Sequence, residues 1–440
     1  MIDIKLLRNN PKEIKSKLAL KGIDPKLVDK FLDIDDRWRK IIYELDELKA
    51  KQNALSEELA KIPKKESLLK KAKELKEKIE ARQSQFKEIE KSREKLLFSF
   101  PNLPLDDVPQ NKEGVVLKEV GDRSKFSAKG GSPPKADAPL EHASGGNFSP
   151  KSYLELAERY DLIDLERAAK VAGSRFGYLK NEAALLEIAL INFAFDFLVK
   201  KKVFIPVFPP VMLKPEIMRG MGYLDQAPEE IYFLPEDKLF LAGTAEHPLI
   251  AMHAGETFQE DELPKRYVAF STCFRREAGS YGKDVKGIMR VHQFDKIEMV
   301  SFCTPETSEK EHEFLLGLEE DLVSALKLPY RVTKLSAQEL AFPSAKTYDI
   351  ECWLPSEEKY RETHSCSNCT DFQARRLNIR YKATAGNKKE TETKFVHTLN
   401  GTALAIGRTL IAILENYQTK EGTIFIPEVL KPYLNLQKIG

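Results

Sequence analysis

Apolar residues recur at alternating steps of four and three over most of the first hundred positions. One run covers residues 27–62 and a second covers 68–100, separated by a proline-containing break at 63–65. This spacing is the heptad pattern of helices that pack against each other. Because the break is short, the two helices must run antiparallel, and at 1.5 Å per residue each is about 50 Å long. The pattern therefore predicts a rod, ended by Pro101 and Pro104.

The pattern changes after the rod. Residues 105–150 are enriched in Pro, Gly and Ser and indicate a connector with one short strand at 115–118. From 151 onward, helical stretches alternate with β-branched and aromatic runs, which is typical of an α+β sheet domain. We therefore expect an arm at 1–104, a linker at 105–150 and a body at 151–440. The runs expected as strands in the body are 203–208, 267–274, 292–302 and 394–399.

Charge is distributed unevenly between these parts. The 440 residues contain 70 Lys+Arg and 68 Asp+Glu, a net charge of +2, which by itself argues against a polyanionic partner. Residues 1–100, however, hold 26 basic and 19 acidic side chains, and 63–100 alone hold 12 and 7. The second helix of the rod is thus basic. Two interpretations stay open: a solvated coiled-coil face with i,i+4 ion pairs, or an edge that follows a phosphate backbone.

Cysteine usage and the apolar segments bear on the compartment. Five cysteines, all in the second half, are too few for a disulfide framework. The first residues show no signal or transit peptide pattern. The most apolar stretch, 183–199, contains three polar interruptions and fails as a membrane span. A soluble, cytoplasmic protein without membrane partners is expected.

The body contains one segment with an unusual set of side chains. Val268 to Glu277 indicates a strand, followed by a Gly- and Lys-bearing loop and a return strand from His292 to Val300. Alternation places Arg275 and Glu277 on one face, and His292, Phe294, Lys296 and Glu298 on one face of the return strand. A cation, carboxylates and an aromatic ring together suit a nucleotide. A surface hairpin with cross-strand ion pairs is the alternative.

This hairpin sequence resembles motif 2 of the class II aminoacyl-tRNA synthetases, specifically those of the bacterial seryl type. Other segments resemble that family in the same order, so the likeness covers nearly the whole chain. They are Lys202–Pro210 (motif 1, which in this class forms the dimer interface), Leu241–Leu249 (the serine-binding TAE segment), Tyr360–Arg376 (the metal and ATP segment) and Asn400–Arg408 (motif 3). The resemblance implies a catalytic domain built on a mainly antiparallel sheet flanked by helices.

The resemblance also implies roles for individual residues at an ATP site. Arg275 would bind the α-phosphate and Glu277 the nucleotide, Phe294 would stack on adenine, and Arg408 would cover its other face and reach the γ-phosphate. Arg275 and Arg408 would thus be catalytic. The implied ATP-binding set is Arg275, Arg276, Glu277, Val291, Phe294, Glu362, Thr363, His364, Ser365 and Arg408.

A serine pocket and a metal site follow from the same resemblance. A carboxylate would meet the α-ammonium group of serine, and polar side chains would lie near its hydroxyl. Glu362 and Ser365 match Mg²⁺ ligands, and their oxygen donors suit a hard cation that bridges phosphates. The implied serine-binding set is Thr244, Ala245, Glu246, Arg275, Glu298, Asn400 and Thr402.

The implied reaction is the ATP-dependent activation of L-serine to seryl-adenylate, with release of pyrophosphate, followed by transfer to the 3′ end of tRNA(Ser). Charging of tRNA(Sec) stays open. The partners implied are tRNA at the N-terminal arm, L-serine, ATP, Mg²⁺ and a second copy of the chain in a homodimer.

Four alternatives are weighed against this interpretation. A catalytically silent relative that only binds RNA should lack phosphate-binding residues such as Arg275 and Arg408, and an activating enzyme that uses no tRNA should lack the rod. His364, Cys366 and Cys369 suggest a zinc knuckle but leave a fourth ligand unassigned. Arg82 and Arg93 lie on the heptad seam, so they either contact tRNA or control coiled-coil register.

Overall fold

The computed structural model describes residues 1–61, 66–123, 148–224, 228–278, 286–384 and 391–440, with the side chains of Thr384 and Thr391 left aside. Within these ranges the chain forms two compact units, Met1–Leu103 and Pro104–Gly440. Several predicted features lie outside the described residues: the break at 63–65, the glycine-rich parts of the connector and most of the loop after Glu277.

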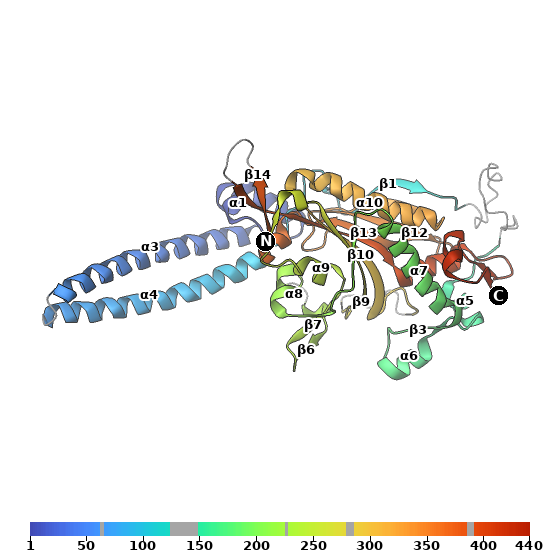
Figure 1. Ribbon diagram of the computed structural model, residues 1–440, viewed down its shortest axis with the longest axis horizontal. Helices are drawn as coiled ribbons and strands as arrows, with labels where there is room; N and C mark the ends of the chain where they lie inside the picture. Colours follow the sequence, from blue (N-terminus) through green and yellow to red (C-terminus); the bar gives the residue numbers. More distant parts are fainter. Residues whose placement is uncertain (62–65, 124–147, 225–227, 279–285, 385–390) are drawn as a thin grey trace. The chain divides into compact units, whose positions relative to one another are not determined.

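The first unit contains the two long helices that the heptads predict. Helix α3 spans Lys26–Lys61 and helix α4 spans Glu66–Phe98. They lie side by side along their length (Figure 1). At 36 and 33 residues they are about 54 and 50 Å long. The predicted helical arm is therefore confirmed.

Two short helices complete this unit, α1 (Ile4–Asn9) and α2 (Pro11–Leu20). With the base of α3 and the end of α4 they enclose a separate hydrophobic core, which includes Leu7, Leu18, Phe31 and Phe100, all fully buried. Phe31 and Phe100 meet edge to face, with ring centroids 6.0 Å apart. The two-helix rod thus starts from a globular base with its own core.

The second unit is built on an eight-stranded sheet in the order β1-β11-β12-β13-β16-β10-β9-β4. Each pair in it is antiparallel except β4 with β9. This confirms the predicted α+β class with a mainly antiparallel sheet. The strands are β1 (Val115–Val120), β4 (Ile205–Val207), β9 (Lys265–Phe274), β10 (Gln293–Cys303), β11 (Tyr330–Lys334), β12 (Lys346–Leu354), β13 (Lys359–Asn368) and β16 (His397–Ala405).

The described part of the connector belongs to this sheet. Strand β1 extends over Val115–Val120 and pairs with β11 at the sheet edge. Asp107 forms one ion pair with Lys346 at 2.7 Å and another with Lys334 at 3.2 Å. Residues 104–123 are therefore ordered against the body.

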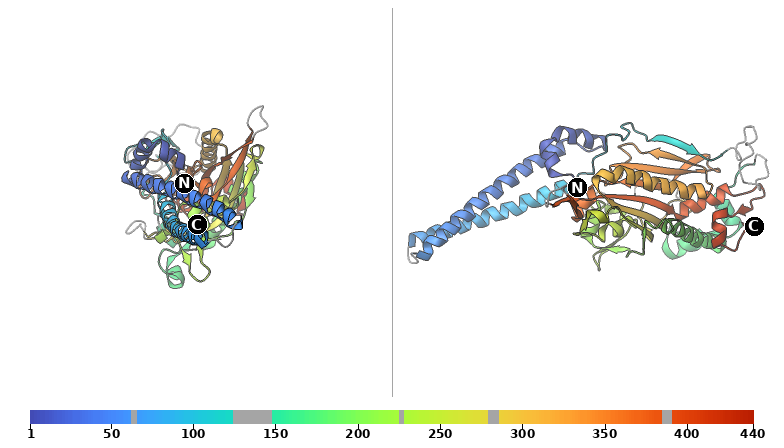
Figure 2. Two further views of the ribbon diagram at one scale, coloured as in Figure 1. Left: turned by 90° about the vertical axis from the view of Figure 1, so that its left-hand side faces the viewer. Right: turned by 45° about the horizontal axis from the view of Figure 1, so that its top comes forward.

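Three helices pack on the sheet: α7 (Asn181–Val199), α10 (Ser308–Ala325) and α12 (Ile406–Asn416). Figure 2 shows α10 lying along the strands. A side chain at Gly401 of β16 would meet Glu319 of α10 at 2.9 Å, so Gly401 lets the helix approach closely. Asn400 and Thr402 flank Gly401 and point to the opposite face of the sheet. That face carries the cavity described below.

One strand prediction needs correction. The run 394–399 was expected as a single strand, but it divides at Val396 between β15 (Thr391–Phe395) and β16. Strand β15 belongs to a second sheet with β14 (Arg380–Thr384) and β8 (Thr257–Gln259). Buried Val396 packs in the core between the two sheets. Across the described ranges, no helix is long and apolar enough to cross a membrane.

Candidate active site

The predicted hairpin is formed by β9 and β10. Their pairing runs from Lys265 opposite Phe302 to Phe274 opposite Gln293. Strand β9 ends at Phe274, three residues earlier than the sequence suggested, but Arg275 N still donates to His292 O at 2.9 Å. Glu277 follows with a left-handed backbone, φ 51°. The β ladder therefore ends just before Arg275 and Glu277, the side chains predicted to bind a nucleotide. Both can then turn toward the cavity beside the hairpin.

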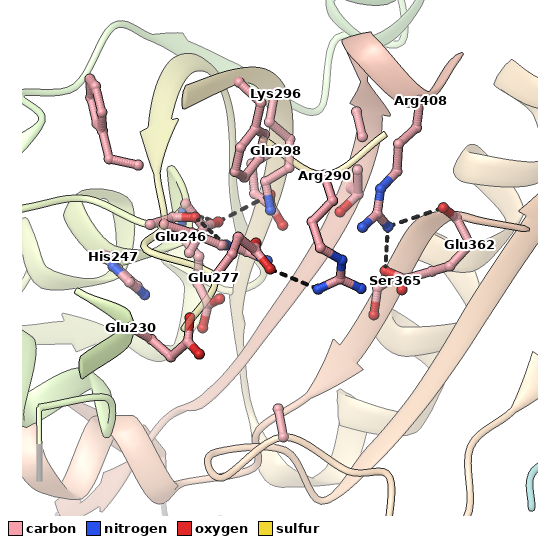
Figure 3. Close-up of a pocket in the computed structure, with 18 of the residues that line it drawn as sticks. Glu230, Glu246, His247, Glu277, Arg290, Lys296, Glu298, Glu362, Ser365 and Arg408 are labelled. Atoms are coloured by element: carbon pink, nitrogen blue, oxygen red, sulfur yellow. Dashed lines mark hydrogen bonds and ion pairs between the residues drawn. The ribbon is translucent and has the colours of Figure 1, made fainter. Parts of the chain in front are cut away.

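This cavity has a volume of about 720 Å³ and gathers residues from segments far apart in the chain (Figure 3). They come from the hairpin, strands β13 and β16, the start of helix α12 and the start of helix α9 (Glu246–Ala251). The sequence-predicted residues that line it are Thr244, Glu246, Arg275, Glu277, Val291, Phe294, Glu298, Glu362, Thr363, Ser365, Asn400, Thr402 and Arg408.

Three predicted site residues do not line the cavity. Ala245 is fully buried in a neighbouring core. Arg276 turns outward, and its guanidinium lies 5.7 Å from the ring centroid of Tyr232. His364 is buried, with Nδ1 2.8 Å from the hydroxyl of Thr363, and burial lowers its pKa to about 3. His364 is therefore a neutral core residue.

The expected face of the return strand is formed by three of its four residues. Phe294, Lys296 and Glu298 line the cavity. His292 does not, because β10 begins one residue after it. Its Nδ1 lies 3.0 Å from Arg275 O, and its ring packs 5.4 Å from that of Phe176. His292 thus closes the end of the hairpin.

One end of the cavity is lined by carboxylates. Glu246 and Glu298 are 4% and 1% exposed. Thr244 Oγ1 donates to Glu298 Oε2 at 3.3 Å, and Gln373 Nε2 donates to Glu246 Oε1 at 2.7 Å. Lys296 forms an ion pair with Glu298. Among these groups the carboxylates of Glu246 and Glu298 are accompanied by one cation, Lys296. A second positive charge bound here would therefore be stabilised.

The electrostatic imbalance appears in the pKa of Glu246. Burial raises it to about 7, with a further contribution from the negative charge of Glu298. Removal from water and a nearby like charge both penalise the ionised form of a carboxyl group. An ammonium group bound between Glu246 and Glu298 would offset both costs. This end of the cavity therefore suits the amino group of an amino acid.

The middle and far end of the cavity carry arginines and an aromatic ring. Arg275 is held by a hydrogen bond from Nε to Gly243 O at 3.0 Å, and its guanidinium lies 5.2 Å from the ring centroid of Phe294. Arg408 Nη1 lies 3.1 Å from Glu362 Oε1 and donates to Glu362 O at 3.0 Å. Figure 3 shows Arg408, Glu362 and Ser365 together, on the far side from His247. Cations beside an aromatic ring suit phosphates and a purine.

The far end also has oxygen donors that fit a hard cation. Asp349 pairs in register with Ser365, and one of its buried carboxylate oxygens has no hydrogen-bond partner. Burial, then the nearby charge of Glu362, raises the pKa of Asp349 well above its usual value. A bound Mg²⁺ would favour the ionised form of Asp349 and give the orphaned oxygen a partner. Glu362 and Ser365 therefore fit the predicted metal.

The described residues contain no group of three His, Cys, Asp or Glu side chains arranged to hold a metal ion. Cys366 and Cys369 are fully buried, and burial raises the pKa of Cys366 well above its usual value. His364 points elsewhere. The zinc alternative thus gains no support from these residues.

Sequence reasoning missed several residues that line the cavity or contact a residue that lines it. Arg290 donates from Nη1 to Glu277 Oε2 at 2.7 Å, and Gln373 orients Glu246. Lys296 was placed on the correct face but given no role. The strand alternation that identified Phe294 and Glu298 was the available signal for Lys296, and the position of Arg290 in the same hairpin was the signal for Arg290. Gln373 reaches the site only through the tertiary fold.

Comparison with known proteins agrees with this geometry. Residues 1–104 match the seryl-tRNA synthetase N-terminal domain family, and residues 233–417 match the tRNA synthetase class II core domain (G, H, P, S and T). The serine--tRNA ligase of Pseudothermotoga lettingae is 41% identical over 446 residues, covering 100% of both chains. This chain belongs to the seryl-tRNA synthetase family. The homologous ligase of Thermotoga petrophila is 43% identical over 448 residues, again with both chains covered in full.

Solved structures of the synthetase family also resemble this chain. Seryl-tRNA synthetase from Pyrococcus horikoshii, complexed with ATP, aligns with a TM-score of 0.88 at 39% identity and covers 100% of this chain and 99% of its own. Cytoplasmic serine-tRNA ligase from Naegleria fowleri, in complex with AMP, aligns with a TM-score of 0.84 at 33% identity, covering 100% and 98%. The class II synthetase assignment therefore extends over both units.

Proposed function

We propose that this synthetase activates L-serine with ATP to seryl-adenylate and then transfers the seryl group to the 3′ end of tRNA(Ser). The observation that carries the proposal is the division of one cavity into two ends. Buried Glu246 and Glu298 lie at one end, and Arg275, Phe294 and Arg408 lie toward the other. An amino acid and a nucleotide bound in this way would place a carboxylate next to an α-phosphate.

In the first step, an oxygen of the serine carboxylate attacks the α-phosphorus, and the bond to the β-phosphate breaks to release pyrophosphate. Glu246 and Glu298 hold the ammonium group, and Asn400 and Thr402 lie near the hydroxyl. Arg275 stabilises the charge that develops on the α-phosphate. No protein nucleophile is needed, since positioning and charge stabilisation supply the acceleration.

The nucleotide would be held by Phe294 against the adenine ring, by Glu277, and by Arg408 at the γ-phosphate. Glu362 and Ser365 would hold Mg²⁺, which when bound neutralises phosphate charge. Asp349 pairs in register with Ser365, and burial, together with the charge of Glu362, raises the pKa of its carboxyl group.

In the second step, a hydroxyl of the terminal ribose attacks the carbonyl carbon of the adenylate, and AMP leaves. We assign tRNA binding to the arm, residues 1–104, and catalysis to 151–440, joined by 105–150. Helix α4 supports this assignment, because it presents lysines such as Lys70, Lys73, Lys87 and Lys91 to solvent. A rod with a basic helix fits recognition of RNA by shape and phosphate contacts. The same arm would bind tRNA(Sec) if the shape of that tRNA matches the shape of tRNA(Ser).

We further infer that the enzyme works as a homodimer in the cytoplasm. Apolar side chains on and after α7 are exposed in the single chain, including Ile188 (56%), Ile205 (47%) and Phe208 (77%). Ile205 and Phe208 lie in the segment that resembles motif 1, and Ile188 lies on the helix before it. All five cysteines are buried and none forms a disulfide, which suits a reducing compartment.

The deciding experiment is amino-acid-dependent exchange of pyrophosphate into ATP, measured for the twenty amino acids. We expect serine to support exchange at least about 100-fold better than alanine, because a site that hydrogen-bonds a hydroxyl strongly rejects an analogue without it. Threonine keeps the hydroxyl, so we expect the pocket to exclude its additional methyl group by shape. A stronger response to alanine or threonine contradicts the assignment. Charging of tRNA(Ser) and tRNA(Sec) transcripts then separates the two acceptors.

A further inference from the structure

A short segment outside the cavity contacts both sides of the β9–β10 hairpin. It comprises residues 173–177, between helix α6 (Leu165–Ala172) and strand β3 (Tyr178–Leu179). Arg175 O accepts a hydrogen bond from His292 N at 2.9 Å, on the return side of the hairpin. Arg175 Nη1 donates to Glu277 O at 2.9 Å, on the outgoing side. One residue therefore bridges both sides of the hairpin.

The packing around Arg175 supports the same bridge. The ring of Phe176 lies 5.4 Å from that of His292. A side chain at Gly177 would come within 2.8 Å of Ile288 Cγ2, so the backbone there lies directly against a residue that lines the cavity. The segment is thus fitted against the hairpin on both sides of Arg175.

The two residues joined by the Arg175 side chain share an uncommon backbone conformation. Arg175 has φ 62° and Glu277 has φ 51°, both in the left-handed region that glycine favours. This backbone conformation costs free energy for residues other than glycine. Such residues adopt it only where their surroundings hold them there. The hydrogen bond between them supplies a mutual restraint at the point where the β ladder has ended.

This restraint acts on a residue whose carboxylate is also fixed. Arg290 Nη1 donates to Glu277 Oε2 at 2.7 Å. Glu277 is therefore held through its carbonyl oxygen by Arg175 and through its carboxylate by Arg290. Arg275, two residues earlier, is held separately by the hydrogen bond from its Nε to Gly243 O at 3.0 Å.

We propose that Arg175 is a positioning residue for nucleotide binding. It does not line the cavity. It holds the backbone of Glu277 and thereby aims the Glu277 carboxylate at the nucleotide. The inference rests on the proposed function, in which Glu277 contacts ATP. It distinguishes the two substrates, because the contacts of residues 173–177 described above go to Glu277, His292 and Ile288, whereas Glu246, Glu298 and Gln373 form the serine end.

The test measures ATP affinity by calorimetry and serine KM by pyrophosphate exchange in the full-length protein. Arg175→Met keeps the aliphatic stem but removes the donor, and should weaken ATP binding about 10-fold, as expected for loss of a charge-assisted hydrogen bond. Arg175→Lys can still donate to the carbonyl and should recover most of this loss. Serine KM should stay within about twofold in both.

Arg167→Ala is the matched control, since Arg167 lies on α6, is 75% exposed at its side chain and pairs with Asp164. It should leave ATP affinity unchanged. If Arg175→Met fails to fold by circular dichroism, Arg175→Gln, which is too short to reach the carbonyl, replaces it.

Three results overturn the proposal: unchanged ATP affinity in Arg175→Met, equal losses for ATP and serine, or a lysine variant no better than methionine. Failure of the proposed function would look different, because the wild-type protein would then show no serine-dependent exchange while the ATP comparison could still be made.

Discussion

At the amino-acid end of the cavity, Glu246 should make serine binding depend on pH. Its pKa is raised to about 7 by burial and by Glu298. Below that pH the carboxyl group is protonated and cannot pair with the serine ammonium, so serine binding should weaken as pH falls. We expect the serine KM to rise by up to about tenfold per pH unit below 7, and serine binding to release protons in that range. Pyrophosphate exchange between pH 6 and 8 measures this directly.

Two variants separate Glu246 from other titrating groups. Glu246→Gln should raise the serine KM by about 100-fold or more, as for loss of a buried charged partner, and should flatten its pH dependence. Glu236→Gln, in the exposed turn after Leu234, is the control and should behave as wild type. If the glutamine variant at 246 retains the full pH dependence, another group is responsible for it.

At the scale of single elements, the sequence predicted those whose signal is local. The heptads located α3 and α4 to within two residues at each end, and alternation placed Phe294 and Glu298 on one face. Strands of two or three residues, such as β5 (Met212–Leu213), are too short to show a period. Gln373 reaches Glu246 only because segments 127 residues apart meet, which no spacing along the chain records.

The seam position Arg93 shows how an element's chemistry depends on its partners. From sequence, Arg93 was a candidate either for tRNA contact or for helix register. In the structure its Nε lies 2.8 Å from Asp35 Oδ1, and its guanidinium lies 4.2 Å from the ring of Trp38. Arg8 also bonds Asp35, at 2.8 and 3.0 Å. These contacts favour a role in fixing α1, α3 and α4 together.

We therefore predict that Asp35→Asn destabilises the arm. Asp35 is fully buried; burial alone would raise its pKa, but hydrogen bonds from Arg8 and Arg93 lower it overall. Since the folded pKa is lowered, this stabilisation is present above the ordinary pKa of an aspartate and is lost as pH falls through the lower, folded value. Breaking the buried pair should cost about 3–5 kcal/mol. Two measurements report this loss: amide hydrogen exchange in α3 and α4, and thermal melting followed by far-ultraviolet circular dichroism.

The neighbouring Asp36→Asn is the matched control. Asp36 is 55% exposed at its side chain and pairs with Arg39 on the surface, so its loss should cost under about 1 kcal/mol. Serine-dependent exchange should be normal in both variants, because Asp35 belongs to the first unit. Equal protection of α3 and α4 in Asp35→Asn and wild type would show that the buried network does not stabilise the arm.

At the scale of the whole molecule, a net charge of +2 conceals two units with opposite balances: 26 basic against 19 acidic residues in 1–100, and an acidic remainder. The basic part coincides with a unit that has its own core at Leu7, Leu18, Phe31 and Phe100. The two activities should therefore be separable by shortening the rod above that core.

Deleting residues 46–80 and joining Glu44–Leu45 to Ala81–Arg82 through a short glycine linker keeps the base core, the Asp35 network and the ion pair from Arg82 Nε to Glu44 at 3.0 Å. Serine-dependent exchange should stay within about twofold of wild type, while kcat/KM for tRNA charging should fall by at least about 100-fold, because several phosphate contacts are lost. A full-length variant with Lys70, Lys73 and Lys76 changed to Gln is the companion. It should lower tRNA affinity and its salt dependence while leaving the helices intact. Normal charging by the shortened chain, or loss of exchange together with charging, would contradict the division of labour between arm and body.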